Sequence, residues 1–89
     1  MIGVYIQIPN LSPTAYTETN GALMAAGVTM AGLKLHTAFV EGEGIAVFDV
    51  WESRADYETF VAEASKTING FESMLTSAQF VEMLDLVTP

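Results

Sequence analysis

The chain of 89 residues contains no cysteine, and only three of its residues are lysine or arginine. Without cysteine it cannot form a disulfide-stapled scaffold, a thiolate nucleophile or a zinc site built on cysteine. One histidine leaves too few nitrogen ligands for an ordinary transition-metal centre, so we expect no metal. Eleven acidic residues give a net charge of −8, which repels nucleic-acid phosphates and anionic lipid headgroups. Neither nucleic acid nor a membrane is therefore expected as a partner.

Long hydrophobic runs are also missing. No stretch approaches the roughly 20 apolar residues that span a bilayer. Met1–Ile8 lacks the basic start and the small-residue cleavage site of a secretion signal, so we expect a cytoplasmic protein. Hydrophobic residues nevertheless make up 51% of the chain and charged residues only 16%, which excludes a disordered chain. A chain this short buries only about 60 to 68% of its surface alone. We therefore expect a single domain over residues 1–89 that forms a homodimer.

Alternating and β-branched residues predict four strands. Over Ile2–Ile8 the even positions are all apolar, which is typical of a strand with one buried face. Two β-branched and aromatic runs, Leu33–Glu41 and Gly44–Glu52, are joined by a tight turn at Gly42-Glu43 and predict a hairpin. The last segment, Gln79–Val87, is predicted as a fourth strand, although part of it would also suit a helix.

Two helices are predicted between these strands. Ser12 followed by Pro13 is typical of a helix start, and the first helix is expected to end near Ala26. Ser53 can cap the second helix, whose apolar residues recur every three or four positions as far as Ile68. A connection with room for one short helical turn separates this helix from the last strand.

The resulting order, β-α-β-β-α-β, predicts an α+β protein with the ferredoxin-like split βαβ arrangement. In that arrangement both helices cover one face of a four-stranded antiparallel sheet, and the other face is bare. Both alternate sets of strand residues are largely apolar here, so the bare face needs cover. Two sheets packed face to face would provide it, and we expect a dimeric α/β barrel with an interior cavity.

Strand parity and the hairpin register assign neighbours across the sheet. In the first strand the even-numbered residues should meet the helices, while Tyr5 and Gln7 face the other way. An even loop length pairs hairpin residues whose numbers add to 85. His36 then lies opposite Asp49, and residue 34, a lysine, lies opposite Trp51.

The pair His36 and Asp49 is the best acid–base candidate in the chain. A carboxylate about 5 Å away across two strands can fix the tautomer of a histidine and raise its pKa. We expect His36 to act as general acid or base and Asp49 to orient it. The pair would face a cavity together with Tyr5 and Gln7, and Glu82 is a further candidate for its lining. The alternative is a hydrogen bond that only satisfies two buried polar groups at a dimer interface.

Two further residues are candidates for substrate binding. Trp51 could stack on a flat ligand, make a cation–π contact with Lys34, or simply pack in the core. Asn20 lies on the apolar face of the first predicted helix, where its amide needs partners. That amide either ties the helix to nearby backbone or contacts a ligand. The sequence contains no glycine-rich phosphate loop, nucleophile elbow or zinc-protease motif.

The segment Phe48–Tyr57 (FDVWESRADY), followed by Phe60, resembles the third strand and second helix of the antibiotic biosynthesis monooxygenase-like superfamily. That resemblance implies a dimeric α/β barrel. It also implies that the fold alone does not choose a reaction, because members include cofactor-free oxygenases, heme-degrading enzymes, cyclases and lactone isomerases. The oxygenase branch uses Asn, Trp and Tyr around its cavity, and Asn20, Trp51 and Tyr5 are of those types.

Two functional hypotheses follow. The first is a small enzyme without metal or organic cofactor that oxygenates, cyclises or isomerises a hydrophobic, aromatic or polyketide-like molecule held between helices and sheet. In it, His36 and Asp49 are catalytic, and Tyr5, Asn20 and Trp51 position the substrate. The second is a non-catalytic dimeric binding or accessory protein of the same fold, in which loss of His36 would cost stability but no turnover.

Overall fold

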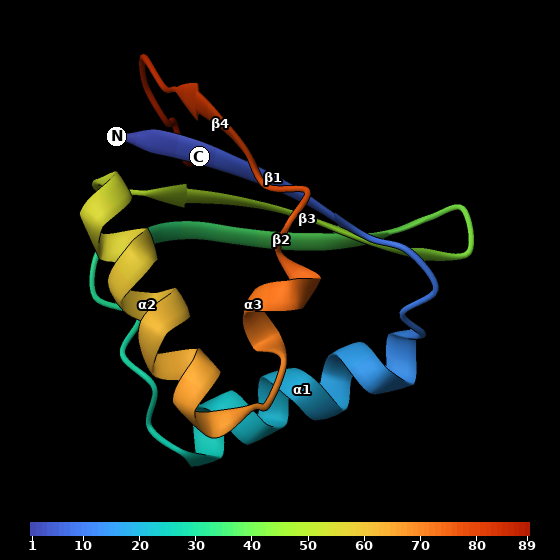
Figure 1. The fold of residues 1–89 in the computed structure, drawn as a ribbon. Helices are drawn as coiled ribbons and strands as arrows, with labels where there is room; N and C mark the ends of the chain where they lie inside the picture. The colour runs from blue at the N-terminus through green and yellow to red at the C-terminus, as the bar shows by residue number, and fades with distance from the viewer.

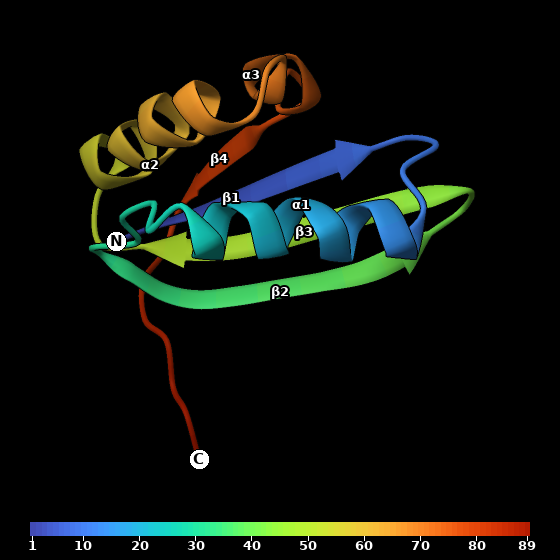
Figure 2. The same ribbon diagram turned by 90° about the horizontal axis from the view of Figure 1, so that it is seen from below.

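Four strands and three helices make up the structure, a computed structural model that describes residues 1–89. The strands form one antiparallel sheet in the order β2-β3-β1-β4, and the helices lie together on one face of it (Figure 1 and Figure 2). This arrangement fits the predicted α+β, ferredoxin-like class, with one short additional helix, α3. In chain order the elements are β1 (Ile2–Ile8), α1 (Pro13–Ala25), β2 (Leu33–Glu41), β3 (Gly44–Trp51), α2 (Arg54–Thr67), α3 (Phe71–Met74) and β4 (Gln79–Glu82).

Serine hydroxyls begin both long helices, as predicted. The Ser12 Oγ accepts a hydrogen bond from the backbone N–H of Ala15 at 3.0 Å, at the start of α1. The Ser53 Oγ accepts one from the N–H of Asp56 at 3.2 Å, at the start of α2. Each bond satisfies a backbone donor that has no partner inside the helix. No helix in the structure combines the length and the apolar character that crossing a membrane would require.

The parity predicted for β1 is confirmed. Val4 and Ile6 are buried in the main apolar cluster between the sheet and the helices. Tyr5 and Gln7 point to the bare face, where the Tyr5 hydroxyl donates to a Glu41 carboxylate oxygen at 2.7 Å and the Gln7 amide donates to the same side chain. Neighbouring residues of a strand point to opposite faces, so β1 separates the covered side from the bare side.

The predicted hairpin register is confirmed over most of its length, including His36 opposite Asp49. It is wrong at Lys34, because β2 has a bulge there and Leu33 lies opposite Trp51 instead. A bulge inserts one extra residue on one strand and shifts every pair beyond it. The turn therefore determines the pairing only as far as the strand stays regular.

The fourth strand is shorter than predicted. It ends at Glu82, which pairs with Ile2, the first residue of β1, and beyond that pair Met83 makes one further backbone hydrogen bond, to Met1. The next residues leave the sheet, and Figure 2 shows the C-terminal segment extending away from the rest of the chain. Leu84 and Val87 in this segment are 96% and 80% exposed. Residues 83–87, predicted as strand, therefore lie outside any strand.

Candidate functional site

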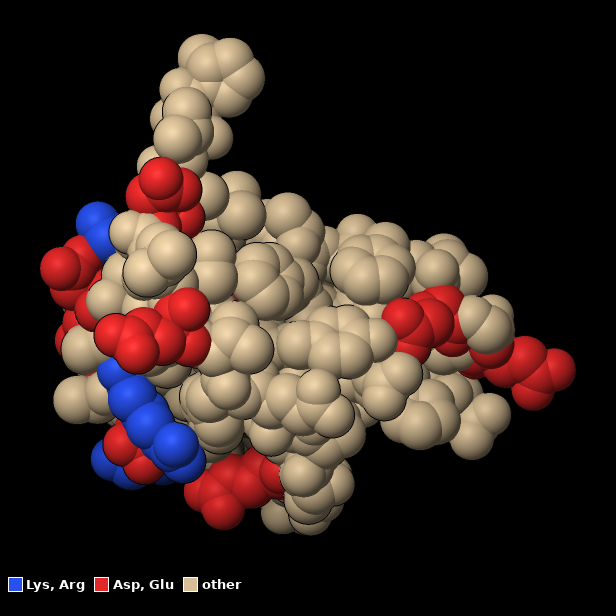
Figure 3. Space-filling view, turned by 90° about the horizontal axis from the view of Figure 1, so that it is seen from above, with Lys and Arg blue, Asp and Glu red and all other residues tan.

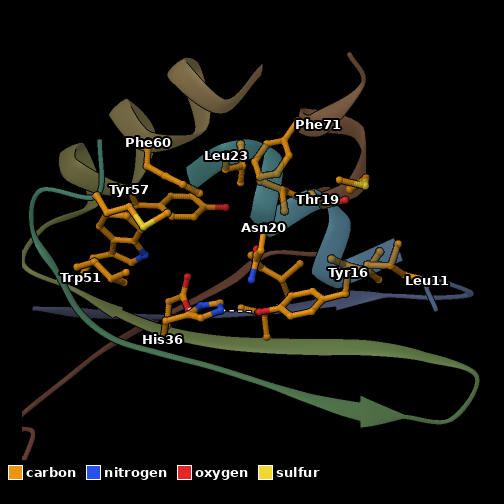
Figure 4. Close-up of a pocket in the computed structure, with 18 of the residues that line it drawn as sticks. Leu11, Tyr16, Thr19, Asn20, Leu23, His36, Trp51, Tyr57, Phe60 and Phe71 are labelled. Carbon is orange, nitrogen blue, oxygen red and sulfur yellow. Dashed lines mark hydrogen bonds and ion pairs between the residues drawn. The ribbon is translucent and has the colours of Figure 1, made fainter. Parts of the chain in front are cut away.

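A cavity of about 200 Å³ lies between the inner face of the sheet and the helices (Figure 4). Of its 19 lining residues, 15 are hydrophobic, so the wall can hold an apolar molecule while a few polar groups orient it. The four others are Thr19, Asn20, His36 and Asp49. Nowhere in the structure do three or more histidine or carboxylate side chains gather as metal ligands.

Each layer of the fold contributes one wall. Ile6 on β1 and Val47 on β3 form the floor, because their side chains point to the covered face of the sheet. The opposite wall includes Leu23 and Phe71, which form with Ala64 a second buried cluster that joins α1, α2 and α3. The cavity therefore exists only when all three helices are docked.

His36 and Asp49 meet across β2 and β3 on this covered face. The Nδ1 atom of His36 lies 2.6 Å from Oδ1 of Asp49. The Asp49 side chain is only 9% exposed, whereas the His36 side chain is 38% exposed. The hydrogen bond to the carboxylate raises the pKa of His36 above its ordinary value of 6.5, assisted by the attraction of the charge and opposed by partial burial.

A tyrosine that the sequence analysis did not single out completes a chain of three groups. The hydroxyl of Tyr16, on α1, lies 2.6 Å from Nε2 of His36, and the two rings are nearly parallel, at 11°. Tyr16 lies four residues before Asn20, on the same face of α1. The placement of Asn20 toward a cavity could therefore have pointed to Tyr16 as well.

The three groups Tyr16, His36 and Asp49 can move a proton between them. Because Nδ1 faces a carboxylate, it carries a hydrogen and donates it to Asp49. In the neutral imidazole Nε2 then accepts the hydroxyl hydrogen of Tyr16, and in the imidazolium it donates to the tyrosine oxygen. We refer to these three side chains as the proton relay. All three residues of the relay line the cavity.

Trp51 is part of the core and lines the cavity at the same time. It is 1% exposed and packs against Tyr57 and Phe60, with ring centroids 6.0 and 5.3 Å away. Its indole nitrogen, Nε1, is buried and has no hydrogen-bond partner. The predicted cation–π contact with Lys34 is absent, because the bulge leaves that ammonium 2.8 Å from Oε2 of Glu52.

Tyr57, from α2, is a second polar group, a hydroxyl donor whose role no sequence pattern around it indicates. Burial, together with the nearby charge of Asp49, raises the pKa of Tyr57 to about 12. The hydroxyl therefore keeps its hydrogen at any physiological pH. Figure 4 shows this hydroxyl pointing into the middle of the cavity.

The side chain of Asn20 makes no hydrogen bond within the chain. The tie between this amide and nearby backbone, one of its two expected roles, is therefore not formed. Figure 4 shows Asn20 pointing from α1 toward the sheet, above the hydrogen bond between Tyr16 and His36. Its amide can both donate to a molecule in the cavity and accept from it.

Tyr5 does not share a cavity with His36, contrary to the sequence-based expectation. The reason is the register: Val4, not Tyr5, lies in the same cross-strand row as His36, and adjacent strand residues face opposite ways. Tyr5 and Gln7 instead bind a carboxylate on the bare face. The structure thus brings together His36, Asp49, Asn20 and Trp51 and separates Tyr5 from them.

Comparison with known proteins finds similar structures but no sequence relatives. No protein-family model matches the sequence, and no curated protein is significantly similar to it. A protein of unknown function from Nitrosomonas europaea is 16% identical, with a TM-score of 0.65 over 99% of this chain and 93% of that one. Two structures described as a "putative antibiotic biosynthesis monooxygenase" also match. The one from Chloroflexus aurantiacus has 12% identity and a TM-score of 0.57, over 100% of this chain and 97% of that chain. The one from Bacteroides thetaiotaomicron has 18% identity and a TM-score of 0.54, over 98% and 90%.

These comparisons establish the fold of the chain. The α+β fold that the sequence resemblance of Phe48–Tyr57 and Phe60 implies is confirmed, because the two structures described as a "putative antibiotic biosynthesis monooxygenase" share it. A fold of this kind supports many reactions, so the function has to be argued from the cavity and the proton relay.

Proposed function

We propose that the protein is a small enzyme that binds a hydrophobic molecule in the cavity and moves a proton on it, without an organic cofactor. One observation carries the proposal: a buried carboxylate, an imidazole and a phenol are linked by two hydrogen bonds of 2.6 Å and end at an apolar cavity. General acid–base catalysis needs a titratable group that a third group orients. His36 is that group, and Asp49 orients it.

The proton transfer follows from the geometry. Tyr16 passes its hydroxyl hydrogen to Nε2 of His36, and its oxygen takes a proton from an acidic C–H or O–H of the substrate. Asp49 stabilises the imidazolium that forms. When the same proton returns to a different substrate atom, the result is an isomerisation, or a cyclisation if the carbanion attacks a carbonyl of the same molecule. The carbanion is also the species that a cofactor-free oxygenase presents to O2. The names of two similar structures favour oxygenation over isomerisation and cyclisation.

Hydrogen–deuterium exchange tests the proposal without knowledge of the natural substrate. The probe is 2-indanone, a bicyclic ketone whose α C–H exchange in D2O is followed by NMR. We expect the wild-type chain to accelerate this exchange and the Tyr16→Phe and His36→Gln variants to lose about 10²- to 10⁴-fold of the acceleration. Tyr5→Phe, on the bare face, is the matched control and should exchange like the wild type. An oxygen electrode in the same reaction separates oxygenation from isomerisation.

A non-catalytic binding protein is the second candidate. The observation in its favour is that both ring nitrogens of His36 already have partners within the chain. Such a closed set of hydrogen bonds can serve stability alone. In that case His36→Gln lowers stability, and wild type and variant exchange the protons of 2-indanone equally slowly.

We also propose that two copies of the chain pack through the bare face of the sheet. Apolar side chains gather there, because Phe48, Val81 and Met83 all lie over Gly3. Each comes within 3.0 Å of the place that a Cβ atom on this glycine would take. Phe39 and Val81 on this face are 46% and 50% exposed. Figure 3 shows a broad uncharged area over the sheet, with acidic residues toward its ends. Hydrophobic surface of this kind marks an interface, and a second copy presents an equally uncharged centre.

Sedimentation velocity tests this dimer with two neighbouring residues of β2. Phe39→Asp places a carboxylate on the bare face and should shift the protein to monomer. Val40→Asp is the control, because Val40 is 67% exposed and points to the other side of the strand. A monomeric wild type, or two variants that dimerise equally well, would contradict the proposal.

A further inference from the structure

We propose that the cavity takes an uncharged molecule of one or two rings, with a ketone or similar carbonyl oxygen that accepts a hydrogen bond from Nε1 of Trp51. This inference rests on the proposed function and specifies the ligand of the same site. Three features of the cavity support it: its size, the hydrogen-bond donors of the residues that line it, and its charge.

The size sets an upper limit on the ligand. An apolar protein cavity of about 150 Å³ holds one benzene molecule. The cavity here, about 200 Å³, has room for one ring with substituents or for two fused rings. A rigid system of three fused rings exceeds it. The wall contains Met24, Met30 and Met74, whose flexible side chains can adjust to the outline of a molecule of this size.

The hydrogen-bond donors define the polar part of the ligand. Nε1 of Trp51 can only donate, and it is buried without a partner, which is costly inside a protein. Tyr57 adds a second donor, because its hydroxyl stays protonated. Asn20 adds an amide without a partner in the chain. A carbonyl oxygen has two lone pairs and can accept from two of these groups at once.

Charge excludes ionised ligands. The buried carboxylate of Asp49 lines the cavity, so a carboxylate or phosphate on the ligand would be repelled whenever His36 is neutral. None of the three lysine and arginine residues lines the cavity to compensate. A cationic ligand would need acceptors, yet the carboxylate is already paired with His36 and the remaining polar groups mainly donate. An uncharged carbonyl compound fits both conditions.

The test uses the only tryptophan of the chain as its reporter. In a ¹⁵N–¹H correlation spectrum, Trp51 gives a single indole signal. Indane and 2-indanone have nearly the same shape, and only the ketone carries an acceptor. We expect 2-indanone to move the indole proton downfield and to bind about tenfold or more tightly than indane, which corresponds to about 1.4 kcal/mol. The tricyclic ketone fluorenone should not bind.

Trp51→Phe keeps an aromatic ring but removes one donor, so this variant should lose most of the preference for 2-indanone over indane. Should the variant not fold, the indole signal of the wild type still decides. Equal affinities for the two compounds in the wild type, an unmoved indole signal, tight binding of fluorenone, or no binding of either small compound up to its solubility would overturn the inference. Binding with a Trp51 shift but without catalysed exchange would leave the ligand assignment standing and refute the enzyme. Catalysed exchange without that shift would leave the enzyme standing and refute the ligand assignment.

Discussion

Replacing Leu23 by alanine is the sharpest test of how the helices form the cavity. Leu23 is 3% exposed and packs against Ala64 and Phe71, in the cluster that joins the three helices. The change removes three buried carbon atoms, each worth about 0.8 kcal/mol of transfer free energy. Comparable leucine-to-alanine changes cost about 2.7 to 5.0 kcal/mol, with the larger losses where the site cannot collapse. Leu23 borders an existing cavity, so the new space stays open and we expect a loss of about 4 kcal/mol.

Urea unfolding at one fixed protein concentration measures this loss, because any dimer makes stability depend on concentration. The matched control is Met24→Ala, one residue further along α1, whose side chain is 70% exposed. The control should change the free energy of unfolding by no more than about 0.5 kcal/mol. Equal losses for Leu23→Ala and Met24→Ala would refute the docking of α1 described above. If the leucine variant folds, its larger cavity should also admit fluorenone.

Three other predictions test separate parts of the structure. Because the pKa of His36 is raised, its pair with Asp49 stabilises the fold fully below about pH 6.5 and loses that contribution as the pH rises through the folded-state pKa. The thermal unfolding temperature of the wild type should therefore fall as the pH rises from about 6, and Asp49→Asn should reduce this fall. Gly21→Ala, in open space on α1, should raise the free energy of unfolding by about 0.5 to 1 kcal/mol. Gly44→Ala would drive a Cβ into the backbone of β1 and should lower it. If urea unfolding found Gly44→Ala more stable than Gly21→Ala, the packing of the turn would be contradicted. Tyr5→Phe should leave the affinity for 2-indanone unchanged, and a loss of binding would show that the bare face contributes to the site.

Local patterns were sufficient to predict most of the fold. Apolar alternation marked β1, and the serine caps marked the starts of both long helices, because these signals depend on residues close together in the chain. The facing of His36 and Asp49 could also be predicted, since a short turn determines the register of the strands that it joins. The bulge at Lys34 and the early end of β4 could not be, because each depends on a partner strand.

The sequence by itself determined the elements, the hairpin register near the turn and the covered face of β1, all of which follow from periodicity and turn chemistry. Only the tertiary structure decided the composition of the site. Tyr16 and Tyr57 reach the cavity because α1 and α2 dock on the sheet at particular positions, and Tyr5 is excluded because its row faces the other way. Helix docking depends on how side chains far apart in sequence fill space together, and a local pattern contains no distances between elements.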